Sequence, residues 1–267
     1  MPHLQSAMPA KGPSQARNVV ADALQLRVHN AGAGPLLTWY RDDARVELSV
    51  RTFANWVDKA TNLLTDLGFI EQPRVWLDLL RTDRLHWQTL VWAWASWQLG
   101  GTIVLQDDEV APMNDTHVAV VGPNRLQDGK LARPIAAEQT IVCALQPLGL
   151  GFPQRPTGVI DGAEVLSQPD VHWSAPPSSP AQSCFQVEST QRTELSWAAL
   201  DELQPDDRRL LVHDELLDTD PFTVPAALLR ASRGAGSLVL LDGSVDAARI
   251  DQLLDQERAE IADFNRS

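Results

Sequence analysis

The sequence has few of the residues that usually reveal a protein's chemistry. Only two of its 267 residues are cysteine, and Cys143 and Cys184 lie far apart in apolar segments. No Cys-x-x-Cys pair and no His/Cys group with the spacing of a metal site is present, so we expect no metal and no cofactor. Isolated thiols in apolar segments are typical of reduced core cysteines, which predicts a cytoplasmic protein.

Positive charge is also scarce. The chain has 22 Lys and Arg against 35 Asp and Glu, and its formal net charge is -13. Because it has no basic cluster, both a nucleic-acid partner and binding to an anionic membrane surface are disfavoured. The polar, proline-broken start lacks the apolar core of a signal peptide. We predict a flexible leader at 1–16, followed by a single domain at 17–267.

The common catalytic motifs are missing as well. The sequence contains no G-x-S-x-G and no H-E-x-x-H, and no G-x-G-x-x-G follows a predicted strand. The densest polar cluster is His213-Asp214-Glu215, where a metal site or a catalytic base competes with an ordinary solvated loop at a strand end. His86 is expected at the surface or at the core boundary. We therefore assign no catalytic residue and no metal ligand.

The clearest feature that is present is a strand-helix-strand pattern at Arg74–Leu105. A nearly continuous apolar run at 74–80 predicts a parallel strand covered on both faces. A helix is expected from about Arg84 to Leu99, because Gly100-Gly101 supplies a C-terminal stop. Residues 102–105 then form the next strand, and the expected connection is a right-handed βαβ unit.

Tryptophan is concentrated in this same stretch, which holds five of the nine in the chain. Trp87, Trp94 and Trp97 recur at helical spacing and predict a buried stripe, with an aromatic ligand cage as the alternative. A membrane span is disfavoured because the glycine pair interrupts the uncharged run at 89–105. Asp78 is either a ligand-contacting residue at the carboxyl end of a strand or a hydrogen-bonded structural residue.

The remaining chain contains a hairpin and then alternates strands with helices. The predicted helices are 16–29, 50–67, 195–203, 223–232 and 246–257, and the predicted strands are 36–40, 46–48, 116–121, 140–145, 183–187, 209–213 and 237–241. Ser49 can cap the helix at 50–67. This order predicts an α/β fold with a mostly parallel sheet flanked by helices. The Ser/Pro-rich segment 174–182 is a candidate internal linker.

Four segments match motifs of one known family. They are 47–53 (ELSVRTF), 74–80 (RVWLDLL), 95–101 (ASWQLGG) and 226–241 (AALLRASRGAGSLVLL). With them, residues 17–260 resemble the N-terminal part of the AMP-binding, adenylate-forming enzymes, which include the acyl-CoA synthetases. The chain looks closest to the short, truncated members from Actinobacteria. The resemblance implies the α/β fold of that domain, because the matched motifs specify fold and not chemistry.

The resemblance also implies a Ser/Thr/Gly-rich phosphate loop ending in Pro-Lys-Gly, which would fall at 184–197. Glycine lets main-chain N–H groups approach phosphate, and lysine neutralises its charge. This segment has neither residue, and it contains Glu188 and Glu194. Ser189, Thr190 and Arg192 are the candidate ligand-binding residues left at this position. They predict weak contact with an anion, and plain strand-to-helix turn chemistry is the alternative.

The sequence ends at Ser267, so the resemblance implies that the family's nucleotide-holding half and mobile C-terminal domain are missing. We expect a non-catalytic, degenerate adenylate-forming-fold protein, a pseudoenzyme, that binds a protein or a small acyl or nucleotide ligand. The alternative is an acyl-activating, AMP-forming ligase-like enzyme with altered nucleotide contacts or completed by a partner subunit. A homo-oligomer is a third hypothesis, because a half-domain would leave apolar surface to cover.

Overall fold

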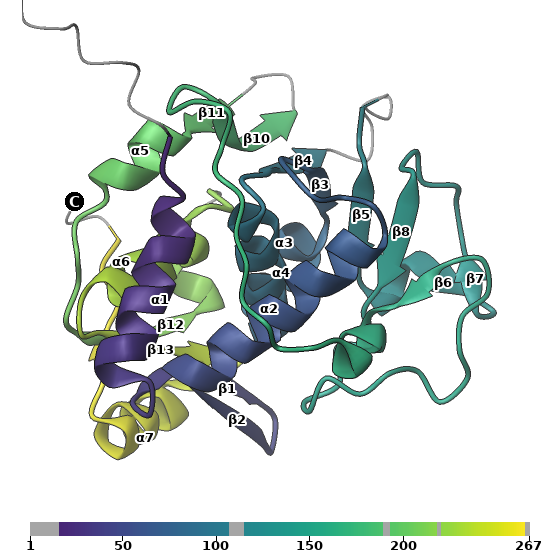
Figure 1. Cartoon of the computed structure of the whole chain (residues 1–267). Helices are drawn as coiled ribbons and strands as arrows, with labels where there is room; N and C mark the ends of the chain where they lie inside the picture. The colour runs from purple at the N-terminus through teal and green to yellow at the C-terminus, as the bar shows by residue number, and fades with distance from the viewer. Residues whose placement is uncertain (1–15, 107–114, 189–192, 218–219, 265–267) are drawn as a thin grey trace, which may run out of the picture.

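The computed structural model describes residues 16–106, 115–188, 193–217 and 220–264, and its strands form two large sheets and a two-stranded ribbon (Figure 1). The first sheet contains β1 (Pro35–Arg41), β2 (Ala44–Ser49), β12 (Arg209–His213), β13 (Ser237–Leu241) and β14 (Glu260–Ile261), in the order β14-β12-β13-β1-β2. The second contains β3 (Arg74–Leu77), β4 (Thr102–Gln106), β5 (Val118–Val121), β8 (Gln139–Val142), β9 (Ile160–Asp161), β10 (Ser183–Glu188) and β11 (Thr193–Ser196), in the order β11-β10-β4-β3-β5-β8-β9. A small ribbon pairs β6 (Leu126–Gln127) with β7 (Lys130–Leu131).

The helices and short 3-10 turns connect these strands. The α-helices are α1 (Val19–Ala31), α2 (Val50–Asp66), α3 (Leu79–Thr82), α4 (Trp87–Gln98), α5 (Trp197–Glu202), α6 (Thr223–Arg233) and α7 (Ala247–Glu257). The 3-10 turns are η1 (Pro123–Arg125), η2 (Gly162–Ser167) and η3 (Asp214–Leu216). The predicted α/β class with mostly parallel strands is confirmed, and Ser49 caps α2 by accepting a hydrogen bond from the Thr52 N–H.

Three expectations about the elements are wrong. The strands are divided between two large sheets instead of forming one, because β1 pairs in parallel with β13, far along the chain. The apolar run at 74–80 holds both β3 and the start of α3, since Asp78 already has right-handed helical backbone angles. Residues 193–196, which include the start of the helix predicted at 195–203, form the antiparallel strand β11 instead.

Helix α4 lies between the two sheets and supplies the centre of the core (Figure 1). It contacts β3 and β4 on the second sheet and packs against α2, which in turn contacts β1 and β2. All of its residues from Trp87 to Gln98 are buried, so the helix has no solvent-facing side. The predicted tryptophan stripe is therefore core, and Trp94 packs edge-on against Phe53 and Trp97.

The outer faces of the sheets are covered in different ways. Helix α7 covers the first sheet, where Leu253 packs with Leu211, Val239 and Leu241. The outer face of the second sheet carries Trp76, Ala119, Val121 and Val142, and residues of the β6–β7 ribbon and of loops pack on it. None of the described helices is long and apolar enough to cross a bilayer.

Segment 174–182 is held against the C-terminal end of α4. The Ala175 N–H donates to the Gln98 carbonyl (2.9 Å), and Asn18 Nδ2 donates to the Ala175 carbonyl (2.7 Å). Gln182 Nε2 donates to the Gly100 carbonyl (2.8 Å). The segment is thus bound along its length, and a division of the chain at this point stays a prediction.

The substitution Trp94→Ala is expected to lower the free energy of unfolding by about 3–5 kcal/mol, because it leaves a large cavity in a core that cannot fully collapse. Trp94 is 1% exposed. Urea unfolding followed by circular dichroism measures the change, with Leu26→Ala on the exposed side of α1 as a control that shifts stability by less than about 0.5 kcal/mol. Equal effects of the two substitutions would show that the Trp94 ring does not support the core.

Candidate functional site

The position expected for a phosphate loop is a β-hairpin. Strand β10 pairs antiparallel with β11, and Gln186 lies opposite Glu194. On its other side β10 pairs in parallel with β4, so the hairpin is an extension of the second sheet. The predicted ligand-binding residues Ser189, Thr190 and Arg192 lie outside the described residues, and their role stays a prediction.

The base of this hairpin carries a chain of polar contacts that ends in carboxylates. Gln186 is buried, and its Nε2 donates to Glu194 Oε1 at 2.9 Å. Its Oε1 accepts from Arg74 Nη1 at 2.9 Å, and Arg74 Nε lies 3.0 Å from Asp115 Oδ2. Arg74 thus lies between Gln186 and Asp115 in this chain of contacts, and Glu194 is the carboxylate at its hairpin end.

A second polar region lies where strands of both sheets reach their carboxyl ends, which is where ligands bind in open α/β folds. Asp242 directly follows β13, and its side chain is 8% exposed. Its Oδ2 accepts a hydrogen bond from Trp39 Nε1 (2.9 Å) and lies 2.8 Å from Arg41 Nη2. Burial raises the pKa of Asp242, although the hydrogen bonds from Trp39 and Arg41 and the charge of Arg41 act in the opposite direction.

Arg41 links this aspartate to the second sheet. Its Nη2 lies 3.5 Å from Asp83 Oδ1, and Asp83 in turn stands close to Gly122 at the end of β5. A Cβ added at Gly122 would lie 3.2 Å from Asp83 Oδ2, so glycine leaves room for that carboxylate. The sequence analysis missed Arg41 and Asp242, although a polar residue directly after an apolar strand is a signal that could have identified Asp242.

Asp78 has the partners of a structural residue. Its side chain is fully buried, and it accepts two hydrogen bonds from Arg125, from Nε at 2.7 Å and from Nη2 at 2.8 Å. Arg81 Nη2 is a third donor at 3.3 Å. Bidentate pairing with arginine satisfies a buried carboxylate and fixes its orientation. This geometry supports the structural alternative for Asp78 over ligand contact.

His86 is a correction to the sequence analysis, which expects it at the surface or core boundary. The residue is fully buried, and its ring packs against Trp39 and Trp87. Its Nδ1 accepts a hydrogen bond from the Gln88 N–H, which makes His86 the N-cap of α4. Burial is the main cause that lowers the pKa of His86 to about 3, so the imidazole is neutral near pH 7.

The His213-Asp214-Glu215 cluster splits in the structure. His213 is buried at the end of β12, whereas Asp214 and Glu215 are exposed. Asp214 Oδ1 lies 3.6 Å from Arg84 Nε, and the cluster borders a hollow of about 100 Å³ next to Gly243 and Ser244. Within the described ranges, no group of three or more His, Cys, Asp or Glu side chains could hold a metal ion.

Comparisons with known proteins agree on the fold. No family model matches the chain. A protein of Mycobacterium tuberculosis that carries only a family designation as its name is 35% identical over 139 residues, which are 50% of this chain and 53% of that protein. The chain therefore spans about half the length of this curated relative.

Solved structures superpose on most of the chain at low sequence identity. A Brucella canis acyl-CoA synthetase superposes with a TM-score of 0.65 at 14% identity, over 94% of this chain and 48% of that one. An anthranilate CoA ligase in complex with anthranoyl-AMP gives 0.64 at 16% identity, over 93% and 50%. The N-terminal domain of a Mycobacterium tuberculosis protein, FACL13, gives 0.63 at 12% identity, over 92% and 61%. The chain has the fold of the N-terminal part of adenylate-forming enzymes, and likeness at this identity establishes the fold alone.

The low pKa of His86 predicts a pH-dependent stability. In the unfolded state His86 binds a proton near pH 6.5, and in the folded state only near pH 3. The contribution of the neutral imidazole to the free energy of unfolding is therefore present above about pH 6.5 and is lost as the pH falls toward 3. Between pH 7 and 4.5 it amounts to about 2–3 kcal/mol. The variant His86→Asn keeps an acceptor for the Gln88 N–H but does not titrate.

Urea unfolding of both proteins across this pH range isolates the contribution of His86. The free energy of unfolding should fall more steeply with acid in the parent protein than in His86→Asn. Parallel pH profiles for the two proteins would show that His86 is not held neutral by burial.

Proposed function

We propose that this chain is a binding protein built on the N-terminal scaffold of the adenylate-forming enzymes, and that it does not form acyl-adenylates itself. One observation carries the proposal. Where a phosphate loop is expected, the hairpin presents Glu194, hydrogen-bonded to Gln186, and Glu188 at the end of β10. A carboxylate next to a triphosphate repels it, and segment 184–197 contains neither the glycine nor the lysine of a phosphate loop.

The proposed partner is a protein or a small acyl or nucleotide ligand. The polar edge formed by Arg41, Asp83 and Asp242 lies at the strand ends where α/β folds bind ligands. Similar structures are named as acyl-CoA synthetases or CoA ligases, and one of them holds anthranoyl-AMP. A cytoplasmic location is part of the proposal, since Cys143 and Cys184 are both free and buried.

The second candidate is an acyl-activating enzyme with altered nucleotide contacts or one completed by a partner subunit. It is favoured by the names of the similar structures, which span ligases of several organic acids. In that case Ser189, Thr190 and Arg192 would have to contact the phosphates in place of glycine and lysine. The two candidates differ in one measurable property, the affinity for ATP.

The chain is expected to show no ATP–pyrophosphate exchange with a panel of fatty and aromatic acids and to bind magnesium-ATP only weakly. The reason is the negative charge at the hairpin. An active acyl-CoA synthetase assayed in parallel is the positive control. Exchange that depends on the acid would overturn the proposal and establish the enzyme candidate.

The next test asks whether the charges of Glu188 and Glu194 are the cause of weak ATP binding. The variant Glu188→Gln/Glu194→Gln should bind ATP about two- to tenfold more tightly than the parent chain if these carboxylates repel the nucleotide. Asp251→Asn on α7, which covers the first sheet, removes an exposed carboxylate away from the hairpin and should leave ATP affinity unchanged. Equal ATP affinity in all three proteins would assign the loss of binding to another feature of the hairpin.

A further inference from the structure

The first sheet changes the direction of its connections between two neighbouring strands. The chain leaves β12 for α6, which packs into the core on the face that carries Val212, and it leaves β13 for α7, which packs on the opposite face that carries Leu211. Strands β12 and β13 pair directly and in parallel, so their carboxyl ends lie side by side. Where neighbouring strands send their connections to opposite faces, a crevice opens at the carboxyl ends, and open α/β sheets bind ligands there.

A hollow of about 100 Å³ lies at this point. It is formed by the carboxyl end of β12 and by the loop that follows β13, and its lining residues are His213, Asp214, Glu215, Gly243, Ser244 and Val245. Gly243 has a positive φ of +105°, a conformation that glycine adopts readily, so the loop can turn here. Pockets for drug-sized ligands measure about 300–1,000 Å³, so this hollow suits a small group and not a nucleotide or an acyl-CoA.

His213 gives the hollow its buried polar group. Side chains alternate along a strand, so His213 lies on the same face of the sheet as Leu211, where Val245 also packs. The residue is 6% exposed, and its ring forms no hydrogen bond and no ion pair with any other residue that the structure describes. A buried polar group without a partner is costly, and such groups are rare in folded proteins. A ligand in the hollow would supply the missing partner.

The rest of the lining carries negative charge. Asp214 and Glu215 are exposed at the mouth of the hollow, as is Ser244 with its hydroxyl group. Arg84 Nε lies 3.6 Å from Asp214 Oδ1, whereas Glu215 has no ion pair with a residue in the described ranges. An anion would meet two carboxylates here, while a cation with N–H donors would meet acceptors. Val245 is half-buried and adds an apolar contact for a short hydrocarbon chain.

We propose that this hollow binds the ammonium group of a primary alkylamine. The ammonium donates one hydrogen bond to a nitrogen of the neutral His213 imidazole, and its other N–H groups donate to the Glu215 carboxylate and to the Ser244 hydroxyl. The first carbons of the alkyl chain contact Val245. Three acceptors of this kind match the three donors of an ammonium group. The ligand is a free amine or the end of a lysine side chain, since both present the same group.

This ligand chemistry rests on the binding role proposed above, but the two can fail separately. The hollow lies at the carboxyl ends of β12 and β13 in the first sheet, whereas the β10–β11 hairpin belongs to the second sheet. Amine affinity and nucleotide affinity are therefore independent measurements. Acid-dependent pyrophosphate exchange would overturn the binding role whatever the amine result, and a lack of amine binding would overturn the ammonium site alone.

The test follows the main-chain amides of Glu215 and Ser244 by NMR while the isotope-labelled full chain is titrated with n-butylammonium at constant ionic strength. Saturation below about 10 mM is expected. n-Butanol has the same chain without the charge, and butanoate has the opposite charge, so each should bind at least about tenfold more weakly.

A blocked tripeptide, acetyl-Gly-Lys-Gly-amide, separates the two sources of the ammonium group. Tighter binding of the tripeptide than of n-butylammonium indicates a lysine side chain of a partner protein. Weaker binding of the tripeptide indicates a free amine. The same two amides report both titrations, so the comparison refers to one site.

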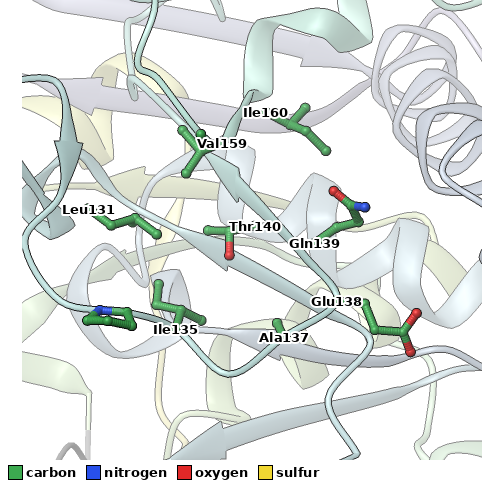
Figure 2. Close-up of a pocket in the computed structure, with 10 residues that line it drawn as sticks. Leu131, Ile135, Ala137, Glu138, Gln139, Thr140, Val159 and Ile160 are labelled. Carbon is green, nitrogen blue, oxygen red and sulfur yellow. The ribbon is translucent and has the colours of Figure 1, made fainter.

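Protein variants locate the site. Glu215→Gln and Ser244→Ala should each weaken n-butylammonium binding about two- to fivefold, and His213→Phe, which keeps an aromatic ring, should weaken it about tenfold or more. Glu138→Gln is the matched control and should leave binding unchanged. Glu138 is an exposed carboxylate at another hollow, of about 490 Å³, beside β8 of the second sheet (Figure 2).

Circular dichroism checks the folding of each variant. Glu215 and Ser244 are exposed, so their variants keep the test valid if His213→Phe does not fold. No saturation below about 10 mM, equal affinity for n-butylammonium and n-butanol, or equal affinity of the Glu215→Gln and Glu138→Gln proteins for n-butylammonium would each overturn the proposal.

Discussion

The complete burial of α4 is the constraint on which the rest of the structure depends. A helix without a solvent-facing side buries its polar side chains too, and a hydrogen-bond partner offsets the cost of that burial. Trp97 Nε1 donates to the Cys184 carbonyl (2.9 Å) and Gln98 Nε2 donates to Asp58 Oδ1 (2.8 Å). These contacts connect α4 to β10 and to α2. The turn after the helix is equally confined, because a Cβ at Gly100 would lie 2.4 Å from the Pro176 carbonyl oxygen.

The polar edge at the strand ends follows from the same packing. Because His86 caps α4, the preceding loop places Asp83 beside Arg41, which also pairs with Asp242 on the first sheet. The two sheets are thus linked by charged groups at one end and by an apolar helix between them. A buried ion pair is weak evidence for stability, because desolvation offsets much of the attraction. The network is better understood as fixing where the two strand ends lie relative to each other.

Local patterns in the sequence predict most elements but not their pairing. The bounds of β12 and β13 follow from apolar runs, and α2 follows from its apolar periodicity and its Ser49 cap. A short apolar run, however, has the same appearance in a buried strand and a buried helix, which is why the prediction extends β3 into α3. The parallel pairing of Leu37 with Leu238 depends on contacts across most of the chain, so no local pattern contains it. The burial of His86 likewise depends on Trp39, which comes from the other sheet.

The site was less predictable than the fold because scaffold and chemistry depend on different residues. Hairpin β10–β11 is held by the burial of Cys184 and Phe185 and by the parallel pairing of β10 with β4, and none of these contacts involves the residues that would hold a phosphate. Loop residues at the tip of such a hairpin can change with little effect on folding. A scaffold of this kind can therefore fold whether or not it binds a nucleotide. Its function has to be argued from the side chains at the hairpin and at the strand ends. Among the described residues, those side chains include the carboxylate of Glu194 at the hairpin and the paired charges of Arg41 and Asp242 at the strand ends.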